Sequence, residues 1–167
     1  GTKSLVESTQ TVTYNTKFRI AGLDIYLNTG DKAFTQHHAV IVPDKAIGNN
    51  RMNSTNVTTG GYVGSFMFSS VLPVYAKLNN HLLSHREYLT NGVSGNSANK
   101  CTWTDVKFNL MSEPEIYGCS VRGGVLDVGL NHRLFPLFRI SPTYISNSVW
   151  RWLRAIYMST NFAYISG

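Results

Sequence analysis

Short strand-like runs separated by turn residues constrain this chain more than any other feature of its sequence. Residues 5–14 and 17–27 are rich in Thr, Val, Ile and Tyr and alternate partly between apolar and polar positions. This pattern predicts two strands of a β-hairpin, joined by a turn at residues 15–16. Residues 37–42 form a further apolar run that Pro43 stops, so we expect a short buried strand there.

Length and composition allow the chain to build a core without disulfides or metals. At 167 residues it is one ordinary domain or two small ones, and about 70% of the unfolded surface can be buried at this size. Only 14% of the residues are charged, well below the usual ~25%. The surface must therefore be finished with Ser, Thr, Asn and Gly, which suits an assembled particle.

A long polar loop and one longer helix are predicted in the middle of the chain. Residues 48–64 hold Asn, Thr, Gly and Ser with little apolar periodicity, which is typical of a functional or interfacial loop near water or a neighbour. Apolar residues over 62–83 approximate helical spacing. We therefore expect a helix there, kinked or restarted at Pro73.

Strands return in the second half of the chain. Residues 92–100 are polar and glycine-containing, which predicts a loop, and residues 102–110 alternate apolar and polar positions as a half-buried strand does. Residues 150–165 predict a strand, a turn at 159–161 and a second strand.

Two capping signals predict short helices between these strands. Ser112 and Glu115 have the S-x-x-E spacing of a capping box, in which the serine caps the third amide and the glutamate reaches back to the cap. Ser141 followed by Pro142 places a cap before a proline in the first helical position. Capped helices between strands indicate an α+β fold that is rich in β-structure.

Histidine and cysteine spacing does not indicate a metal site or a disulfide framework. His81 and His85 are four residues apart, the spacing of two side chains on one helical face, but a zinc site needs at least a third ligand. We therefore expect them to be two partly exposed histidines near the end of a helix. His37 and His38 are neighbours that a strand would point to opposite faces. The two cysteines, at 101 and 119, are expected to be buried thiols, although they bracket a strand and turn and could approach each other.

Charge and motifs argue against several classes of function. The net charge is +6, but residues 1–99 and 100–167 each contribute +3 and no basic stripe forms, so specific nucleic-acid binding is not expected. No apolar run approaches the ~20 residues of a membrane span, and no signal peptide is seen. The sequence holds neither a phosphate-binding loop nor a nucleophile elbow, so we expect no enzyme activity and no cofactor.

Five sequence blocks in the last third resemble a known module. Their order is similar to a C-terminal module of structural proteins of tailed bacteriophages, usually in or beside capsid proteins, in which WLR is followed by an FAYV-like strand. The blocks are EIYG (115–118), DVG (127–129), FPLFRISP (135–142), WRWLRA (150–155) and FAYISG (162–167). The resemblance covers roughly residues 81–167 and extends more loosely to the C-type-lectin-like fold.

This resemblance implies a virion protein that acts by assembly. Residues 1–80 would be an assembly segment, and residues 81–167 a C-type-lectin-like module. The related proteins continue beyond the FAYV-like strand to a GVRP-like motif, so the module here would lack its closing strand. Its partners would be other copies of the chain and other virion proteins, in a domain of the head shell or attached to it. A receptor-binding or glycan-binding module of a tail fibre or baseplate, holding a host-surface ligand, is the alternative.

Candidate contact residues follow from the loop and from the resembling blocks. Asn53, Asn56 and Tyr62 lie in or beside the polar loop and are expected to face neighbouring copies. Arg151 and Arg154, in the WLR block, would bind an anion, pack on aromatic rings or bridge carboxylates at an interface. The sequence assigns none of the five to catalysis.

Overall fold

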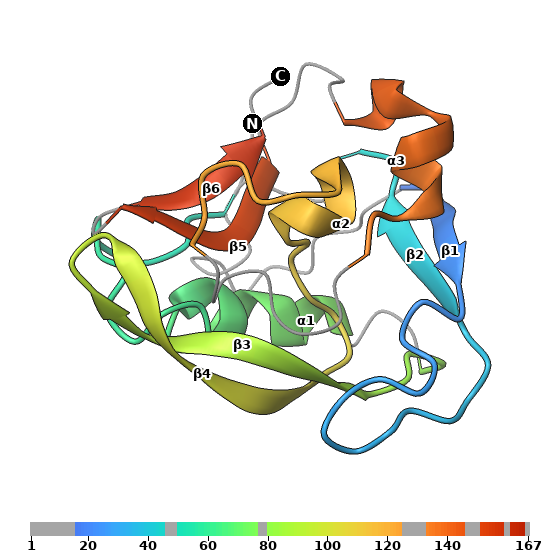
Figure 1. The fold of residues 1–167 in the computed structure, drawn as a ribbon, viewed down its shortest axis with the longest axis horizontal. Helices are drawn as coiled ribbons and strands as arrows, with labels where there is room; N and C mark the ends of the chain where they lie inside the picture. Colours follow the sequence, from blue (N-terminus) through green and yellow to red (C-terminus); the bar gives the residue numbers. More distant parts are fainter. Residues whose placement is uncertain are drawn as a thin grey trace.

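The computed structural model describes residues 16–45, 50–76, 80–124, 133–145, 151–158 and 161–165. Together they form a small α+β protein in which six strands make three separate antiparallel pairs (Figure 1). The strands are β1 Phe18–Leu23, β2 Ala39–Pro43, β3 His85–Ser94, β4 Ser97–Val106, β5 Arg151–Met158 and β6 Asn161–Ile165. The helical elements are η1 Met67–Val71, α1 Leu72–Ala76, α2 Glu113–Tyr117, α3 Pro136–Ile140 and η3 Pro142–Tyr144. None of these helices is long and apolar enough to cross a membrane.

The first strand pair joins β1 to β2. The strand predicted over 17–27 ends at Leu23, and it pairs with Ala39–Pro43, while the predicted partner at 5–14 lies outside the described residues. The pairing shifts between Ile20 and Gly22, which leaves Ala21 as an extra, bulged residue. Because the bulge adds one residue, Ile20 and Leu23 both face outward. The prediction that residues 37–42 are buried was wrong, since only Val42 of β2 is buried.

Asp24 stabilises the turn that follows β1. Its Oδ1 accepts a hydrogen bond from the His38 backbone N–H at 2.8 Å, and its Oδ2 lies 2.8 Å from His37 Nδ1. These two contacts, that of His37 first, hold the pKa of the Asp24 carboxyl below its usual value. A carboxylate with a lowered pKa stabilises the fold above its unfolded pKa of about 3.9, and the stabilisation is lost as the pH falls through the lower folded value.

We therefore expect Asp24→Asn to be less stable than the parent chain at pH 7 and equally stable at strongly acidic pH. Asparagine keeps an acceptor for the His38 amide but loses the charge that His37 contacts. Urea midpoints measured from pH 7 to pH 2 would show the difference closing below about pH 4. A difference that stays constant across this range would contradict the assignment.

The polar loop before η1 is held by the β3 strand. Residues 50–64 contain no helix or strand, in agreement with the loop predicted over 48–64 in its described part. Val63 donates its backbone N–H to Thr90 O at 2.9 Å. Gly61 has φ +65°, and a Cβ there would lie 2.7 Å from the same carbonyl oxygen, so the close approach requires glycine.

The predicted helix exists but is shorter than expected. Helical structure over the described residues runs through η1 and α1, not from 62 to 83. The irregularity lies just before Pro73, where a π-turn lets Leu72 N–H bond to Met67 O. Proline has no N–H, so a change of hydrogen-bond spacing at this point agrees with the predicted kink.

A long hairpin replaces the loop predicted over 92–100. The chain pairs β3 with β4 through a two-residue turn at Gly95 and Asn96, of which only Gly95 has a positive φ, +59°. Glycine in the first turn position suits a two-residue hairpin. The strand predicted over 102–110 is therefore offset, and β3 was missed.

The short helices follow the local signals only in part. Ser112 and Glu115 form the predicted capping box, with Ser112 N donating to Glu115 Oε2 at 2.7 Å and Glu115 N donating to Ser112 Oγ at 3.3 Å. Pro142 does begin a helical turn, η3, but Ser141 makes no side-chain cap, so that detail was wrong. The helix α3 was not predicted.

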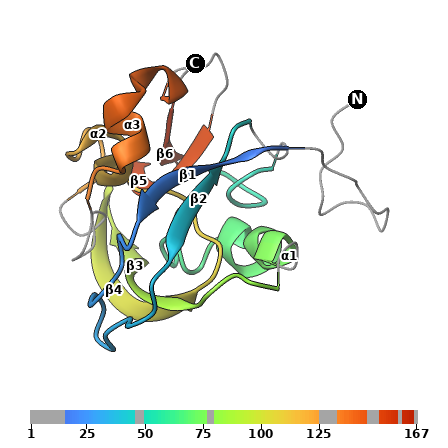
Figure 2. The same cartoon turned by 90° about the vertical axis from the view of Figure 1, so that its right-hand side faces the viewer.

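Strand β5 separates two hydrophobic cores. Leu153 and Ala155 pack in one core, with β1, β2, α2 and α3, whereas Ile156 packs in the other, with η1, α1, β3 and β4. Figure 2 shows the β1–β2 pair in front and the β3–β4 pair curving below it. Each core draws residues from both sides of residue 80. Two-stranded pairs are marginal alone, so packing across β5 stabilises all three.

Candidate functional site

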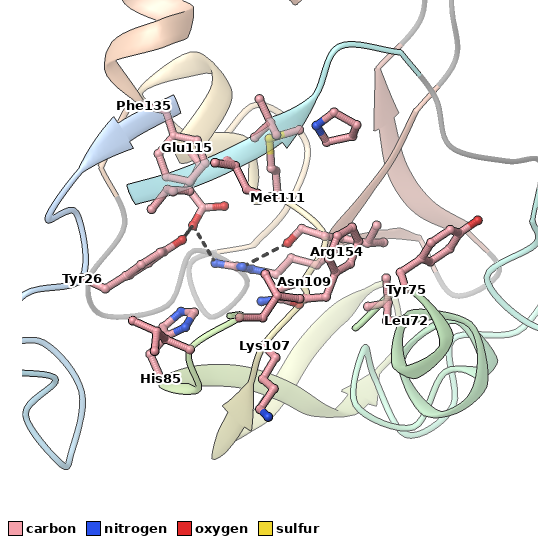
Figure 3. Close-up of a pocket in the computed structure, with 18 of the residues that line it drawn as sticks. Tyr26, Leu72, Tyr75, His85, Lys107, Asn109, Met111, Glu115, Phe135 and Arg154 are labelled. Carbon is pink, nitrogen blue, oxygen red and sulfur yellow. Dashed lines mark hydrogen bonds and ion pairs between the residues drawn. The ribbon is translucent and has the colours of Figure 1, made fainter. Parts of the chain in front are cut away.

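A cavity of about 700 Å³ lies between the two cores. Tyr26, Val42 and Phe135 line it from one core, and Leu72 and Tyr75 line it from the other (Figure 3). Most of its remaining lining is also aliphatic or aromatic. A concave, mainly apolar cavity of 300 to 1,000 Å³ with a few convergent polar groups is the usual form of a small-molecule site.

The wall of the cavity includes part of a buried charged cluster. We call Tyr26, His85, Glu87, Glu115 and Arg154 the Arg154 cluster. Arg154 NH2 lies 3.5 Å from Glu115 Oε1 and 3.8 Å from Glu87 Oε2. The Tyr26 hydroxyl donates to Glu115 Oε1 at 3.0 Å, and His85 Nε2 lies 3.1 Å from Glu87 Oε1. These residues come from β3, β5, α2 and the turn between β1 and β2, so the cluster ties these parts together.

Burial and charge fix the protonation of two members of the Arg154 cluster. Burial raises the pKa of the Tyr26 phenol well above its ordinary value, and the charges of Glu115 and Glu87 raise it further. Burial works to lower the pKa of the Arg154 guanidinium, but the same two carboxylates outweigh it and hold that pKa above its ordinary value. Tyr26 is therefore a hydrogen-bond donor and Arg154 a permanent cation.

The backbone of β5 aims Arg154 at this cluster. Trp152 pairs with Tyr164 and Ile156 with Phe162, so three residues of β5 stand opposite one of β6. Released from the ladder, Arg154 N–H donates to Met111 O at 3.1 Å, and its NH1 donates to Leu110 O at 3.1 Å. Bulges of this kind redirect side chains next to functional sites.

The WLR tripeptide has one structural role for each residue. Trp152 packs against one core and donates its Nε1–H to Asn50 O at 2.8 Å. Leu153 is buried in the other core. Arg154, 4% exposed, neutralises the two carboxylates between them. The block that carries the family resemblance is thus explained by packing and charge inside this chain.

Both carboxylates of the Glu113-Pro114-Glu115 segment are used inside the protein. Glu113 accepts the backbone N–H groups of Val121, Arg122 and Gly123 at 2.8 to 3.1 Å. Glu115 accepts from its capping partner and from Tyr26. Among the described residues, no three His, Cys, Asp or Glu side chains gather as metal ligands.

The histidines and cysteines are placed differently from the sequence expectation. His81 lies in the turn before β3 and His85 is the first residue of β3, so they share no helical face, yet both line the cavity. His85 stacks on Tyr26 with ring centroids 4.1 Å apart. Neither Cys101 nor Cys119 forms a disulfide, but Cys101 is half-buried and Cys119 exposed, so the prediction of two buried thiols was wrong.

The five candidate contact residues lie in different environments. Tyr62 is buried, donates to Asn109 Oδ1 at 2.6 Å and accepts from Leu110 N, and Arg154 is buried as well, which argues against interface roles for both. Asn53 is half-buried and bonds to its own loop at Val57 O and Phe66 N. Arg151 is half-buried and lines the cavity, whereas Asn56 is exposed.

An exposed apolar surface lies over β1 and α3. We call Ile20, Leu23, Pro136, Leu137 and Ile140 the β1–α3 patch, because together with the β1 backbone they line one shallow hollow. Ile20, Leu23 and Ile140 are 60%, 68% and 80% exposed. Apolar side chains gathered in this way mark interaction surfaces more often than scattered single ones do.

Sequence reasoning missed Tyr26 and Glu87, and it had no signal for either. Glu87 meets Arg154, and Tyr26 meets Glu115, only in the folded protein, although each pair is far apart along the chain. Comparison with protein-family models, curated proteins and solved structures finds no match to this chain. Its function is therefore argued from its own residues.

Proposed function

We propose that this chain is a structural protein of a tailed-phage particle, a domain of the head shell or attached to it, which acts through protein–protein contacts and not as an enzyme. Its partners are other copies of the chain and other virion proteins. The resembling blocks of the last third and the low charge content support this function. Neither nucleic acid nor a membrane is needed for it.

The β1–α3 patch is the observation that carries the proposal. Three large aliphatic side chains stand mostly in water on neighbouring elements, around a hollow that an apolar side chain of a partner fits. Removing one such side chain from water stabilises a contact by about 1.5–3 kcal/mol. Subunits that recur many times in a particle need this kind of surface.

The test is the association of the purified chain in solution. We expect sedimentation velocity to show concentration-dependent self-association, and Ile140→Asp to weaken it by at least about tenfold, because a charge then replaces the most exposed patch side chain. Val74→Asp is the control, since Val74 is 42% exposed on α1 and lies outside the patch.

Particle association is tested separately. An antibody against the recombinant chain should label tailed-phage particles purified from the source of the sequence. A chain that remains a monomer at all concentrations and is missing from such particles would contradict the proposal. If both aspartate variants weaken self-association equally, the β1–α3 patch is not the contact surface.

A receptor-binding or glycan-binding module of a tail fibre or baseplate is the second candidate. It is favoured by Tyr88 and Trp103, which pair across β3 and β4 with ring centroids 5.2 Å apart. They are half-buried, on the face of the hairpin opposite Glu87 and Leu89. Such aromatic faces can stack on sugar rings. Binding to a glycan array that Trp103→Ala abolishes would favour this candidate over assembly.

The finer fold assignment belongs to the same proposal. We propose that residues 81–167 are a variant of the C-type-lectin-like module. The order of α2, α3, β5 and β6 over the resembling blocks supports it. Sugar binding through calcium is not part of the proposal, because Glu113 and Glu115 are engaged by the protein itself.

A further inference from the structure

The cavity between the two cores has a lining that selects one kind of ligand. Its walls are built mainly of aliphatic and aromatic side chains, including Phe108, which stacks on Tyr75 with centroids 5.7 Å apart. Several lining residues, among them Ala39, Lys45 and Lys107, are exposed, so the cavity is partly open to water and a ligand can enter it. The apolar walls require a ligand with an apolar body.

Charge in the lining is predominantly positive. Lys45, Lys107, Arg151 and Arg154 line the cavity, whereas Glu115 is the single carboxylate among its described lining residues. Glu115 is already satisfied by Tyr26, Arg154 and the capping amide. Glu87 lies behind the wall, 3% exposed, and is engaged by His85 and Arg154. The described lining therefore holds four basic side chains and one carboxylate, a balance that favours an anionic ligand group over a cationic one.

Arg151 and Lys45 mark the end of the cavity where an anion fits best. Both lie near Asp44: Arg151 NH2 donates to Asp44 O at 3.5 Å, and the charge of Lys45 acts on the Asp44 carboxyl. The Asp44 carboxylate forms an ion pair with Arg19. Burial lowers the pKa of the Arg151 guanidinium, and Asp44 opposes this only in part. A second negative charge beside Arg151 would offset the cost of its burial.

A hydrogen-bond donor without a partner lies in the same lining. Asn109 accepts from Tyr62 through its Oδ1, but its buried Nδ2 has no hydrogen-bond partner among the described residues. Buried donors are normally satisfied, and an unsatisfied one costs about 1–3 kcal/mol. An acceptor atom of a ligand, or a water bound in the cavity, supplies the missing partner.

We infer that this cavity binds an apolar molecule with a single carboxylate, of the long-chain fatty acid type. The chain of the ligand lies between the two cores, and its carboxylate lies at the Lys45 and Arg151 end. This site shares no lining residue with the β1–α3 patch. The inference does not depend on the proposed assembly function.

Three ligands with the same alkyl chain test the inference. Dodecanoate, dodecanol and dodecylammonium are titrated into the full chain below their micelle concentrations, with calorimetry and the fluorescence of Trp152 and its neighbours as readouts. We expect one dodecanoate to bind per chain, about tenfold more tightly than dodecanol, with dodecylammonium the weakest, because one ion pair in a partly buried site is worth about 1.4 kcal/mol or more.

Two variants locate the carboxylate. Arg151→Gln should weaken dodecanoate about tenfold and leave dodecanol unchanged, since it removes charge and keeps most of the side-chain volume. Lys45→Gln, at an exposed position, should act in the same direction and is safe for folding. Lys100→Gln, on the exposed edge of β4 outside the cavity, is the control and should change neither ligand.

Each other outcome overturns the inference. Saturable binding of none of the three ligands would remove the site. The site would not recognise a carboxylate if dodecylammonium bound as tightly as dodecanoate. The same would follow if the charge variants weakened the binding of dodecanoate and dodecanol equally. Failure of self-association in solution would leave these results unchanged, so the two proposals fail separately.

Discussion

Arg154→Met is expected to lower the free energy of unfolding by about 3–5 kcal/mol, because it leaves two buried carboxylates without their cation. Glu87 and Glu115 are 3% and 1% exposed, so water cannot replace the guanidinium. Arg154→Met also removes the side-chain donor to Leu110 O. Met111 O keeps its hydrogen bond, because its donor is the backbone N–H of residue 154. Urea denaturation at pH 7 measures the loss.

A triple variant distinguishes charge from packing in this result. Glu87→Gln and Glu115→Gln added to Arg154→Met remove all three charges with little change in volume. Replacing a buried ionic group as a whole is far less costly than breaking it, so the triple variant should recover about 2 kcal/mol or more of the stability that the single variant loses. A triple variant less stable than Arg154→Met would show that the Arg154 cluster does not act as one electrostatic unit.

Glu113→Ala is expected to have the second large effect, a loss of about 3 kcal/mol in the free energy of unfolding, because hydrogen bonds to a charged group contribute about 1.5–3 kcal/mol each. Glu113 is 3% exposed, and its carboxylate is the acceptor for three successive backbone N–H groups of residues 121–123. The loss is smaller than the sum of the three bonds, since the segment can turn these amides toward water.

Local measurements separate this effect from general destabilisation. Hydrogen exchange of the amides of residues 121–123 should accelerate in Glu113→Ala before exchange in β3 and β5 does. Asp105→Asn removes an exposed carboxylate from β4 and serves as the control. Unchanged exchange at 121–123 would mean that Glu113 does not hold this segment.

Elements whose signals depend on a few neighbouring residues could be predicted from the sequence. The capping box of Ser112 and Glu115 depends only on residues three apart, and it formed as predicted. The two strands predicted over 150–165 were also found, as β5 and β6, and so was the strand beginning near residue 18, whereas residues 159–160 of the predicted turn lie outside the described residues. In each case the apolar pattern and the local turn residues agree with the final fold.

Tertiary partners explain what could not be predicted. Strand β3 buries Glu87 on one face and Thr90 on the other, so its buried positions are not all apolar and its alternation is hidden. The helix expected from residue 62 starts later because Tyr62 and Val63 bond to residues of β3 and of the segment after β4. The cluster and the cavity depend on contacts between residues far apart in sequence, for which a single sequence contains no signal.

The position of β5 between the two cores also sets the order in which the protein can fold. The β3–β4 hairpin and the η1–α1 turn rest on local contacts, which form early. Among the described strands and helices, only β5 contributes to both cores, so neither core can close fully until residues 151–158 are available. During synthesis the apolar faces of the earlier elements therefore stay exposed to water until β5 has been made.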